Sequence, residues 1–137
     1  MIQTIVPTQP NCETIQWISI CTLEDIYPNT GVCAWVNGEQ IAIFRVVGSV
    51  NDTNNNQVYA ISNYDPFSQA YVLSRGLVGD RNGVLKVASP IYKQNFCLTT
   101  GRCLDDETVS LPVFPVRIIN GQVEVGVFAP HQENAEI

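Results

Sequence analysis

Two Asn-Gly dipeptides, each between runs rich in apolar and β-branched residues, constrain the fold of this chain most strongly. Asn37-Gly38 separates Val32–Val36 from Gln40–Val47, and Asn120-Gly121 joins Phe114–Ile119 to a closing run in which valines alternate with Gln and Glu. Asn and Gly accept the positive φ angles of a two-residue hairpin turn, and a period of two is that of a β-strand. The sequence therefore predicts two tight hairpins.

Further short strands are predicted between turn residues, whereas only one stretch has a helical signal. Thr22–Asp25 resembles a helix start with Thr22 as its cap, and Pro28 ends it after about one turn. Many short strands joined by short turns are typical of an all-β protein, an antiparallel sandwich or barrel with almost no helix. The additional predicted strands are Trp17–Cys21, Gln57–Ser62, Val84–Ala88, Asn95–Leu98 and Arg102–Leu104.

The chain of 137 residues, 45% of them apolar, is long enough for one globular domain. Residues 1–14 contain two prolines and predict a flexible N-terminal arm, and the polar stretch 130–137 predicts a flexible tail. The Asn-rich stretch 48–56 predicts a solvated loop. We therefore expect a single domain over residues 1–137, with a core of about 15–129.

Charge and composition exclude several kinds of partner. The net charge is −6 and the seven Lys and Arg residues are scattered, which argues against nucleic acid. No apolar run approaches the ~20 residues of a membrane span, and Met1–Ile5 does not resemble a secretory signal. Five cysteines, an odd number, are most simply explained as reduced thiols. We expect a cytoplasmic protein.

Residues that could carry chemistry are few. The single histidine, His131, lies in the predicted tail, so histidine-based catalysis and zinc binding within one chain are improbable. The acidic run 105–107 predicts a solvated turn rather than an acid–base pair. Cys97 and Cys103 could face each other across a hairpin, as packed or free thiols or, alternatively, as a redox pair. We expect no catalytic residue in this chain.

Two segments resemble the ligand loops of a Rieske iron–sulfur domain. Residues 58–67 read Val-Tyr-Ala-Ile-Ser-Asn-Tyr-Asp-Pro-Phe, close to the usual Val-Tyr-Ala-Ile-x-Asn-x-Cys-Pro-His. Residues 89–104 follow Cys-Pro-x-His-Gly-x-x-Phe-x-Leu-x-Thr-Gly-x-x-Leu except at the Cys, the His and the Gly after it. The resemblance runs from about Trp17 to Val127 and implies a Rieske-like fold.

At the four positions that the resemblance assigns to cluster ligands stand Asp65, Phe67, Ser89 and Tyr92. A Rieske centre needs two thiolates on one iron and two imidazoles on the other, and a phenyl ring cannot bind iron at all. We therefore predict no metal and no iron–sulfur cluster in this chain. An empty cluster site would cost stability, so we expect Phe67 and Tyr92 to meet and fill the space.

A Rieske-like domain without its ligands resembles the small subunit of the cytoplasmic, assimilatory NAD(P)H-dependent nitrite reductase, an oxidoreductase of nitrate assimilation. Residues 17–26, 31–34 and 36–44 and the spacer 68–83 are similar to that family. The resemblance implies a non-catalytic chain that binds and supports a large subunit, which carries siroheme, a 4Fe-4S cluster and FAD and reduces nitrite to ammonium.

The tip formed by the two former ligand loops is the predicted interface, since exposed aromatic residues are enriched in protein interfaces. The alternative for these rings is that they only pack the loops. Two other functions stay open: a Rieske-type electron-transfer protein with atypical ligands, and a general protein-binding module. The predicted interface residues are Tyr64, Phe67, Tyr71, Tyr92 and Lys93.

Overall fold

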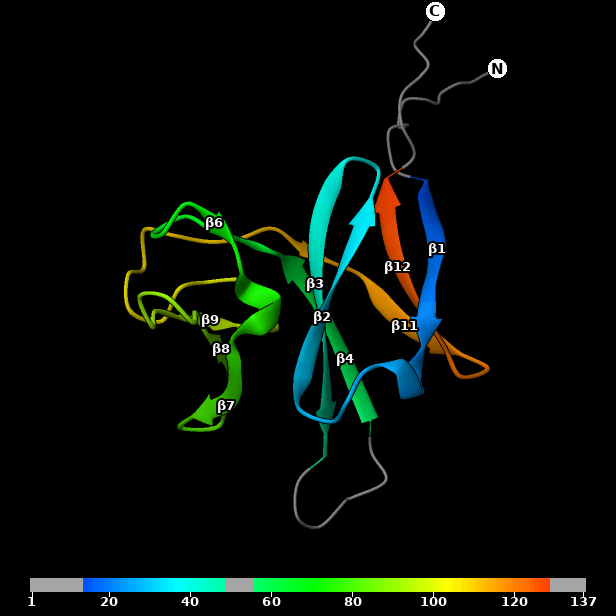
Figure 1. The fold of residues 1–137 in the computed structure, drawn as a ribbon, viewed down its shortest axis with the longest axis horizontal. Helices are drawn as coiled ribbons and strands as arrows, with labels where there is room; N and C mark the ends of the chain where they lie inside the picture. The colour runs from blue at the N-terminus through cyan, green and yellow to red at the C-terminus, as the bar shows by residue number, and fades with distance from the viewer. Residues whose placement is uncertain (1–13, 49–55, 129–137) are drawn as a thin grey trace, which may run out of the picture.

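The computed structural model describes residues 14–48 and 56–128, and within these ranges the chain forms strands and two 3-10 helices but no α-helix (Figure 1). The all-β prediction is therefore confirmed. The predicted N-terminal arm, most of the Asn-rich loop, the tail and His131 lie outside the described residues. In chain order the elements are β1 (Ile15–Thr22), η3 (Leu23–Asp25), β2 (Thr30–Val36), β3 (Glu39–Val47), β4 (Asn56–Ser62), β5 (Tyr64–Asp65), β6 (Ala70–Tyr71), η4 (Leu73–Arg75), β7 (Leu77–Arg81), β8 (Val84–Ala88), β9 (Asn95–Cys97), β10 (Val113–Phe114), β11 (Val116–Ile119) and β12 (Gln122–Phe128).

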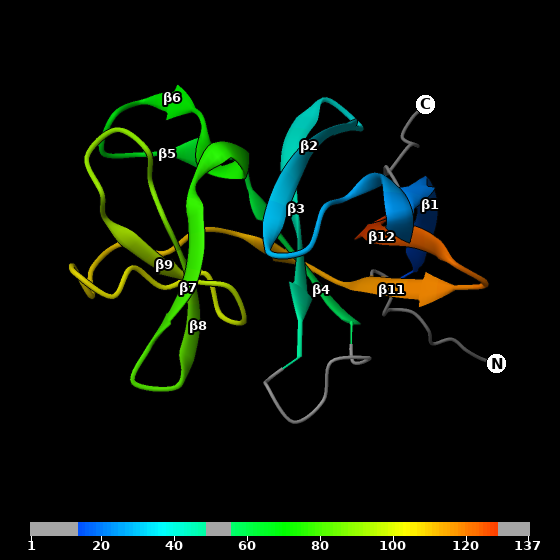
Figure 2. The same cartoon turned by 60° about the horizontal axis from the view of Figure 1, so that its bottom comes forward.

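A central antiparallel sheet, in the order β10-β4-β3-β2, forms the middle of the molecule. Strand β3 has partners on both sides and is covered on both faces, so residues 41–46 are all buried. This explains its nearly continuous apolar run, because a strand between two layers has no solvent face. Figures 1 and 2 show this sheet between two smaller ones.

The two faces of the central sheet form two hydrophobic cores. Ile41 and Ile43 point toward the sheet β1-β12-β11 and pack with Val123 and Val125 of β12, whose alternation was predicted. On the opposite face, Ala42 and Phe44 pack with residues of the sheet β7-β8-β9, of η4 and of the loops that follow β9. The former ligand loops belong to this second layer.

Three hairpin turns have the backbone that the Asn-Gly pairs predict. Asn37 and Gly38 have φ of 49° and 83°, Asn120 and Gly121 have 52° and 80°, and the Asn82–Gly83 turn between β7 and β8 is of the same kind. Gly101 is required for a further reason, because a Cβ at its positive φ would collide with the carbonyl oxygen of Leu111.

Two strand predictions were wrong in detail. The expected strand 114–119 is broken at Pro115, so that β10 pairs with β4 in the central sheet while β11 pairs with β12 in the neighbouring one. Proline cannot donate a ladder hydrogen bond, which explains the break. Residues 102–104 form only isolated bridges, one of them between Cys103 and Phe96, rather than a strand.

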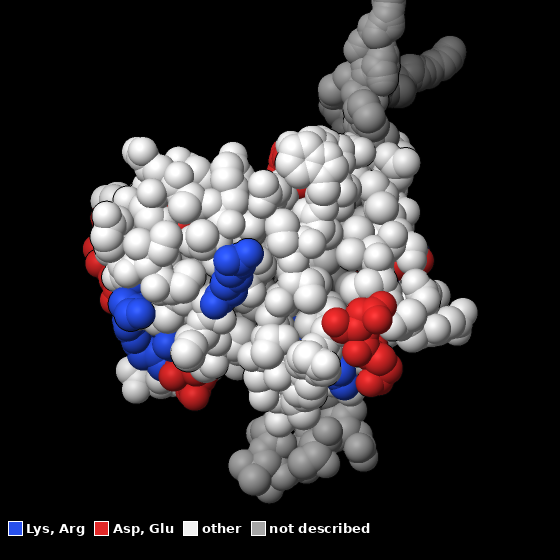
Figure 3. All heavy atoms as spheres, viewed as in Figure 1, with Lys and Arg blue, Asp and Glu red and all other residues white. Residues whose placement is uncertain are grey.

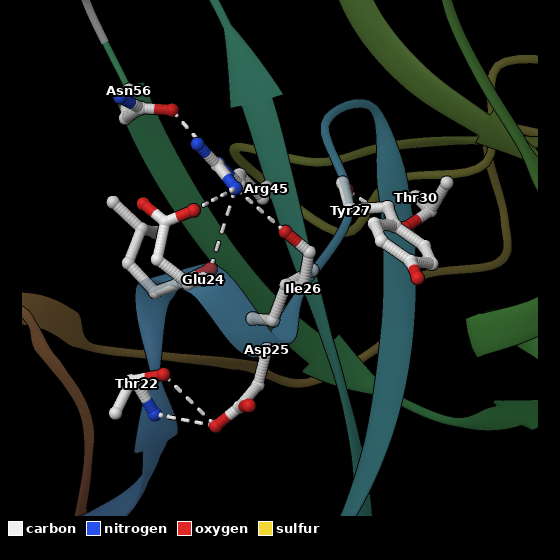
Figure 4. Close-up of polar contacts among 9 residues, drawn as sticks. Thr22, Glu24, Asp25, Ile26, Tyr27, Thr30, Arg45 and Asn56 are labelled. Carbon is white, nitrogen blue, oxygen red and sulfur yellow. Dashed lines mark hydrogen bonds and ion pairs between the residues drawn. The ribbon is translucent and has the colours of Figure 1, made fainter.

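The short turn after β1 is fixed from two sides (Figure 4). Thr22 is the N-cap residue of η3, as predicted, and the Asp25 carboxylate accepts bonds of 3.0 Å from its backbone N–H and its hydroxyl. From the central sheet, the buried Arg45 guanidinium donates to the carbonyl oxygen of Ile26 at 2.8 Å. Arg45 also lies 4.0 Å from the exposed Glu24 carboxylate. Arg45 also donates to the side-chain oxygen of Asn56 at 2.8 Å and to the Leu23 carbonyl at 3.4 Å, so uncharged oxygens hold this buried cation.

Candidate functional site

The two segments that resemble Rieske ligand loops meet in space at two buried oxygen-bearing side chains. Asp65 belongs to β5, Ser89 directly follows β8, and neither has any exposed surface. The Ser89 hydroxyl donates a 2.6 Å hydrogen bond to Asp65 Oδ2. The positions assigned to the two cysteines of a Rieske centre are therefore joined directly, by a hydrogen bond between their replacements.

The Asp65 side chain is fixed by its own turn as well as by Ser89. Its Oδ1 accepts the Phe67 N–H at 2.9 Å, and its Oδ2 also accepts the Ser68 hydroxyl at 2.8 Å. The Asp65 carbonyl accepts the Gln69 N–H at 2.7 Å, which closes the connection from β5 to β6. An aspartate that accepts bonds from the next residues organises a tight turn. Three donors satisfy a buried carboxylate that has no cation among these partners.

The positions assigned to the two histidines are not brought together in the same way. Phe67 is partly buried and packs on the core ring of Phe96, with centroids 6.1 Å apart and planes inclined at 47°. Tyr92 is 60% exposed. The expectation that Phe67 and Tyr92 meet and fill the space was therefore wrong for Tyr92. The Asp65–Ser89 bond was missed, although two oxygen side chains at neighbouring ligand positions were a signal for it.

These four side chains do not fit a Rieske [2Fe-2S] cluster. The cluster needs two thiolates and two imidazoles, whereas this set offers a carboxylate and a hydroxyl bound to each other, a phenyl ring and an exposed phenol. Among residues 14–48 and 56–128, no group of three or more His, Cys, Asp or Glu is arranged to hold a metal ion. We therefore derive no electron-transfer step through such a cluster.

An aromatic groove lies beside the first of the two segments that resemble ligand loops, residues 58–67. It has a volume of about 790 Å³. Tyr64 and Tyr71 pair across β5 and β6 with ring centroids 5.0 Å apart, and Trp35 of β2 forms another part of the lining. Trp35 was not among the predicted interface residues. Its signal in the sequence was weak, because a tryptophan in an apolar strand is usually buried.

The cysteines that the structure describes are free thiols. Cys97 and Cys103 are both buried, and Cys103 lies opposite Phe96, so the two cysteines are not directly across from each other. Burial opposes ionisation of Cys97, but hydrogen bonds from Thr100 and then Thr99 outweigh it and lower the pKa of this thiol. The interpretation as packed, free thiols agrees with this arrangement.

The acidic run is more structured than the predicted solvated turn. Asp105 accepts the Asn95 backbone N–H at 2.8 Å and a bond from its side-chain amide at 3.1 Å, and Arg81 lies 3.2 Å away. The backbone bond from Asn95 is the largest cause of a lowered pKa at Asp105, and burial is the opposing effect, which the bonds from Asn95 and Arg81 together outweigh. Asp105 thus ties the acidic run to β9.

The surface offers no continuous basic area on the face drawn in Figure 3, where blue and red side chains form small separate groups on a mostly uncharged surface. Within the described part of the chain, neither 3-10 helix has the length or apolarity needed to span a membrane. The four antiparallel sheets of the described residues and the two joined loops define a Rieske-like domain that carries other side chains at the ligand positions.

Comparisons with known proteins agree with this class. The family model described as Rieske-like [2Fe-2S] domain matches residues 16–126. The nitrite reductase (NADH) small subunit of Salmonella typhimurium is 49% identical over 110 residues, which cover 80% of this chain and 96% of that protein. The solution structure of NirD from E. coli has a TM-score of 0.74 and 45% identity, covering 83% of this chain and 98% of NirD.

A third relative is a much longer protein. In the nitrite reductase NAD(P)H large subunit of Klebsiella oxytoca, a region is 40% identical over 118 residues, covering 86% of this chain but only 12% of that protein. The chain belongs to the Rieske-like domain family and, within it, to the family of nitrite reductase small subunits.

Proposed function

We propose that this chain is the non-catalytic small subunit of a cytoplasmic NAD(P)H-dependent nitrite reductase, and that it binds and supports the large subunit. One observation supports the large subunit as the partner: the Klebsiella large subunit contains within one polypeptide a region that matches 86% of this chain. A domain that is joined to its partner in one organism has a reason to bind that partner where the two are separate chains. The near full-length match to the separate small subunit of Salmonella gives the same assignment.

The redox groups belong, in this proposal, to the large subunit, which would carry siroheme, a 4Fe-4S cluster and FAD. The donor set at Asp65, Phe67, Ser89 and Tyr92 supports this division, because it offers no thiolate and no imidazole. The same point argues against the alternative of a Rieske-type electron carrier with atypical ligands. The small subunit then acts through binding, by stabilising or ordering the large subunit near its redox centres.

The docking surface that we propose is the end of the molecule where the former ligand loops meet. Tyr71 is 56% exposed and Tyr92 is 60% exposed, and Lys93 is exposed beside Tyr92. Tyr64 is half-buried against Tyr71, while Phe67 packs inward on Phe96 and would support the surface from beneath. Exposed tyrosines bring large contact area with little loss of side-chain entropy, which suits an interface.

Co-purification tests this function directly. The tagged chain, expressed with its large subunit in nitrite-grown cells, is isolated under native conditions and its visible spectrum recorded. We expect a large companion protein with siroheme and flavin absorbance and NAD(P)H-dependent nitrite reduction. An isolated chain without that companion, or with an unrelated partner, would contradict the proposal and favour a general binding module.

A further inference from the structure

The tip of the β2–β3 hairpin presents a tryptophan to solvent. Trp35 is 71% exposed, whereas its neighbours Ala34 and Val36 are buried. Residues in a strand alternate between faces, so Trp35 lies on the opposite face of the central sheet from Ala34 and Val36. The core shared with β12 covers the face of Ala34 and Val36 up to the hairpin. On the Trp35 face, the layer that contains the sheet β7-β8-β9 leaves the tip of the hairpin uncovered.

The place where this layer ends is the aromatic groove. Besides Trp35, it is lined by Tyr64 and Tyr71, whose rings are in contact at a tilted angle, and by two prolines, Pro66 and Pro112. Glu39 is the single charged residue in its lining. Most exposed large side chains of a soluble protein are isolated, whereas several aromatic and proline rings around one hollow are typical of a binding surface.

Hydrogen bonds to the buried Asn63 fix Gln40, one of the residues that line the groove. Asn63, which is almost completely buried, donates from its side-chain amide to Gln40 Oε1 at 3.1 Å and accepts the Ser74 N–H at 2.7 Å. The Asn63 backbone N–H donates to the Gln40 carbonyl at 3.0 Å. These bonds connect β3, the start of β5 and η4, so the hollow is formed before any partner arrives. A preformed site loses less conformational entropy on binding.

We infer that this groove is the anchoring site for an apolar segment of the nitrite reductase large subunit, with Trp35 as its main contact residue. The inference rests on the proposed function and adds a residue and a pocket to it. The lining combines aromatic, proline and aliphatic side chains with four uncharged polar ones, Gln40, Ser62, Thr108 and Ser110, and one carboxylate. It therefore fits an apolar segment that also offers hydrogen-bonding groups, rather than a highly charged one. The large subunit is the occupant because a relative of it contains this domain in the same chain.

Binding measurements with matched variants test the inference. Purified large subunit is titrated with the wild-type chain, Trp35→Ala, Tyr71→Ala and the control Tyr27→Ala, by calorimetry. Tyr27 is a suitable control because its ring is 78% exposed and it lies before β2, outside the groove lining. Truncation of a central aromatic contact weakens binding by about 30-fold or more, and we expect that for Trp35→Ala. We expect about tenfold for Tyr71→Ala and less than about twofold for the control.

The outcomes separate this inference from the function on which it rests. If the wild-type chain does not bind the large subunit, the proposed function fails and takes the anchoring site with it. If the wild-type chain binds and Trp35→Ala binds equally well, the function stands and the anchoring site is refuted. Sedimentation of the chain alone tests whether a second copy of the chain occupies the groove instead. A homodimer that dissociates in the Trp35→Ala variant would assign the groove to that second copy and overturn the inference. Unchanged thermal unfolding of the variants confirms that they fold.

Discussion

The hydrogen bond between Ser89 and Asp65 should contribute measurably to stability, because it joins two loops that no disulfide links in the described structure. Ser89→Ala removes a buried 2.6 Å bond to a carboxylate. Hydrogen bonds to charged groups contribute about 1.5–3 kcal/mol, so we expect the free energy of unfolding to fall by about 2 kcal/mol. Ser68→Ala is the matched control. It removes a bond to the same oxygen from a half-buried hydroxyl, and we expect a loss of about 1 kcal/mol.

A double-mutant cycle isolates the bond itself. Asp65→Ala removes all three side-chain bonds to the carboxylate and should cost about 4 kcal/mol. Independent effects would sum to about 6 kcal/mol in the double variant Asp65→Ala/Ser89→Ala. We expect about 4 kcal/mol instead, because Ser89 has no carboxylate left to bind, and so a coupling of about 2 kcal/mol. Urea unfolding followed by circular dichroism measures each value. Additivity within about 0.5 kcal/mol would refute the reasoning.

Three further predictions concern other parts of the molecule. Arg45→Met leaves the Ile26 carbonyl without its 2.8 Å donor and should lower the free energy of unfolding in urea by about 3 kcal/mol. The control Glu24→Gln changes only an exposed pair at 4.0 Å and should lower it by less than about 0.5 kcal/mol. Equal losses in the two variants would contradict this. The pKa of Asp105 is lowered in the folded state, so its contribution to stability is present above about pH 4 and is lost as the pH falls through the folded pKa. The urea midpoints of Asp105→Asn should therefore decline less than those of wild type below about pH 4. Parallel curves of midpoint against pH would refute this. After reconstitution with iron and sulfide, elemental analysis should find substoichiometric iron, and a stoichiometric cluster would contradict the reading of the donor set.

Local sequence signals predicted those parts of the fold that local physics decides. The Asn-Gly turns were correct because few residues accept positive φ at both central positions, and the valine alternation in β12 was correct because one face of that strand is buried. The break at Pro115 could not be predicted from a run that is apolar on both sides. It depends on which neighbouring sheet each half joins. The single-domain organisation with a core of about 15–129 stays a prediction.

The candidate site was predicted in its location but not in its contacts. The resemblance identified the four former ligand positions, yet Ser89 and Asp65 are 24 positions apart in the sequence. They meet because the fold brings β5 next to the loop that follows β8. Tyr92 is exposed. The sequence could not predict this, because the direction of the Tyr92 ring depends on the path of its loop. Trp35 was missed because its exposure follows from where the covering layer ends, which is a property of the tertiary structure.

Hydrogen–deuterium exchange of this chain, alone and with excess large subunit, tests most directly whether the partner docks at the former ligand end. We expect slower exchange of amides in Trp35–Gly38 and Tyr64–Tyr71 in the complex, with β1 and β12 unchanged, since those two strands lie in the sheet on the other side of the central one. A complex that forms without slowing exchange in either segment, or that protects β1 and β12 instead, would contradict the account.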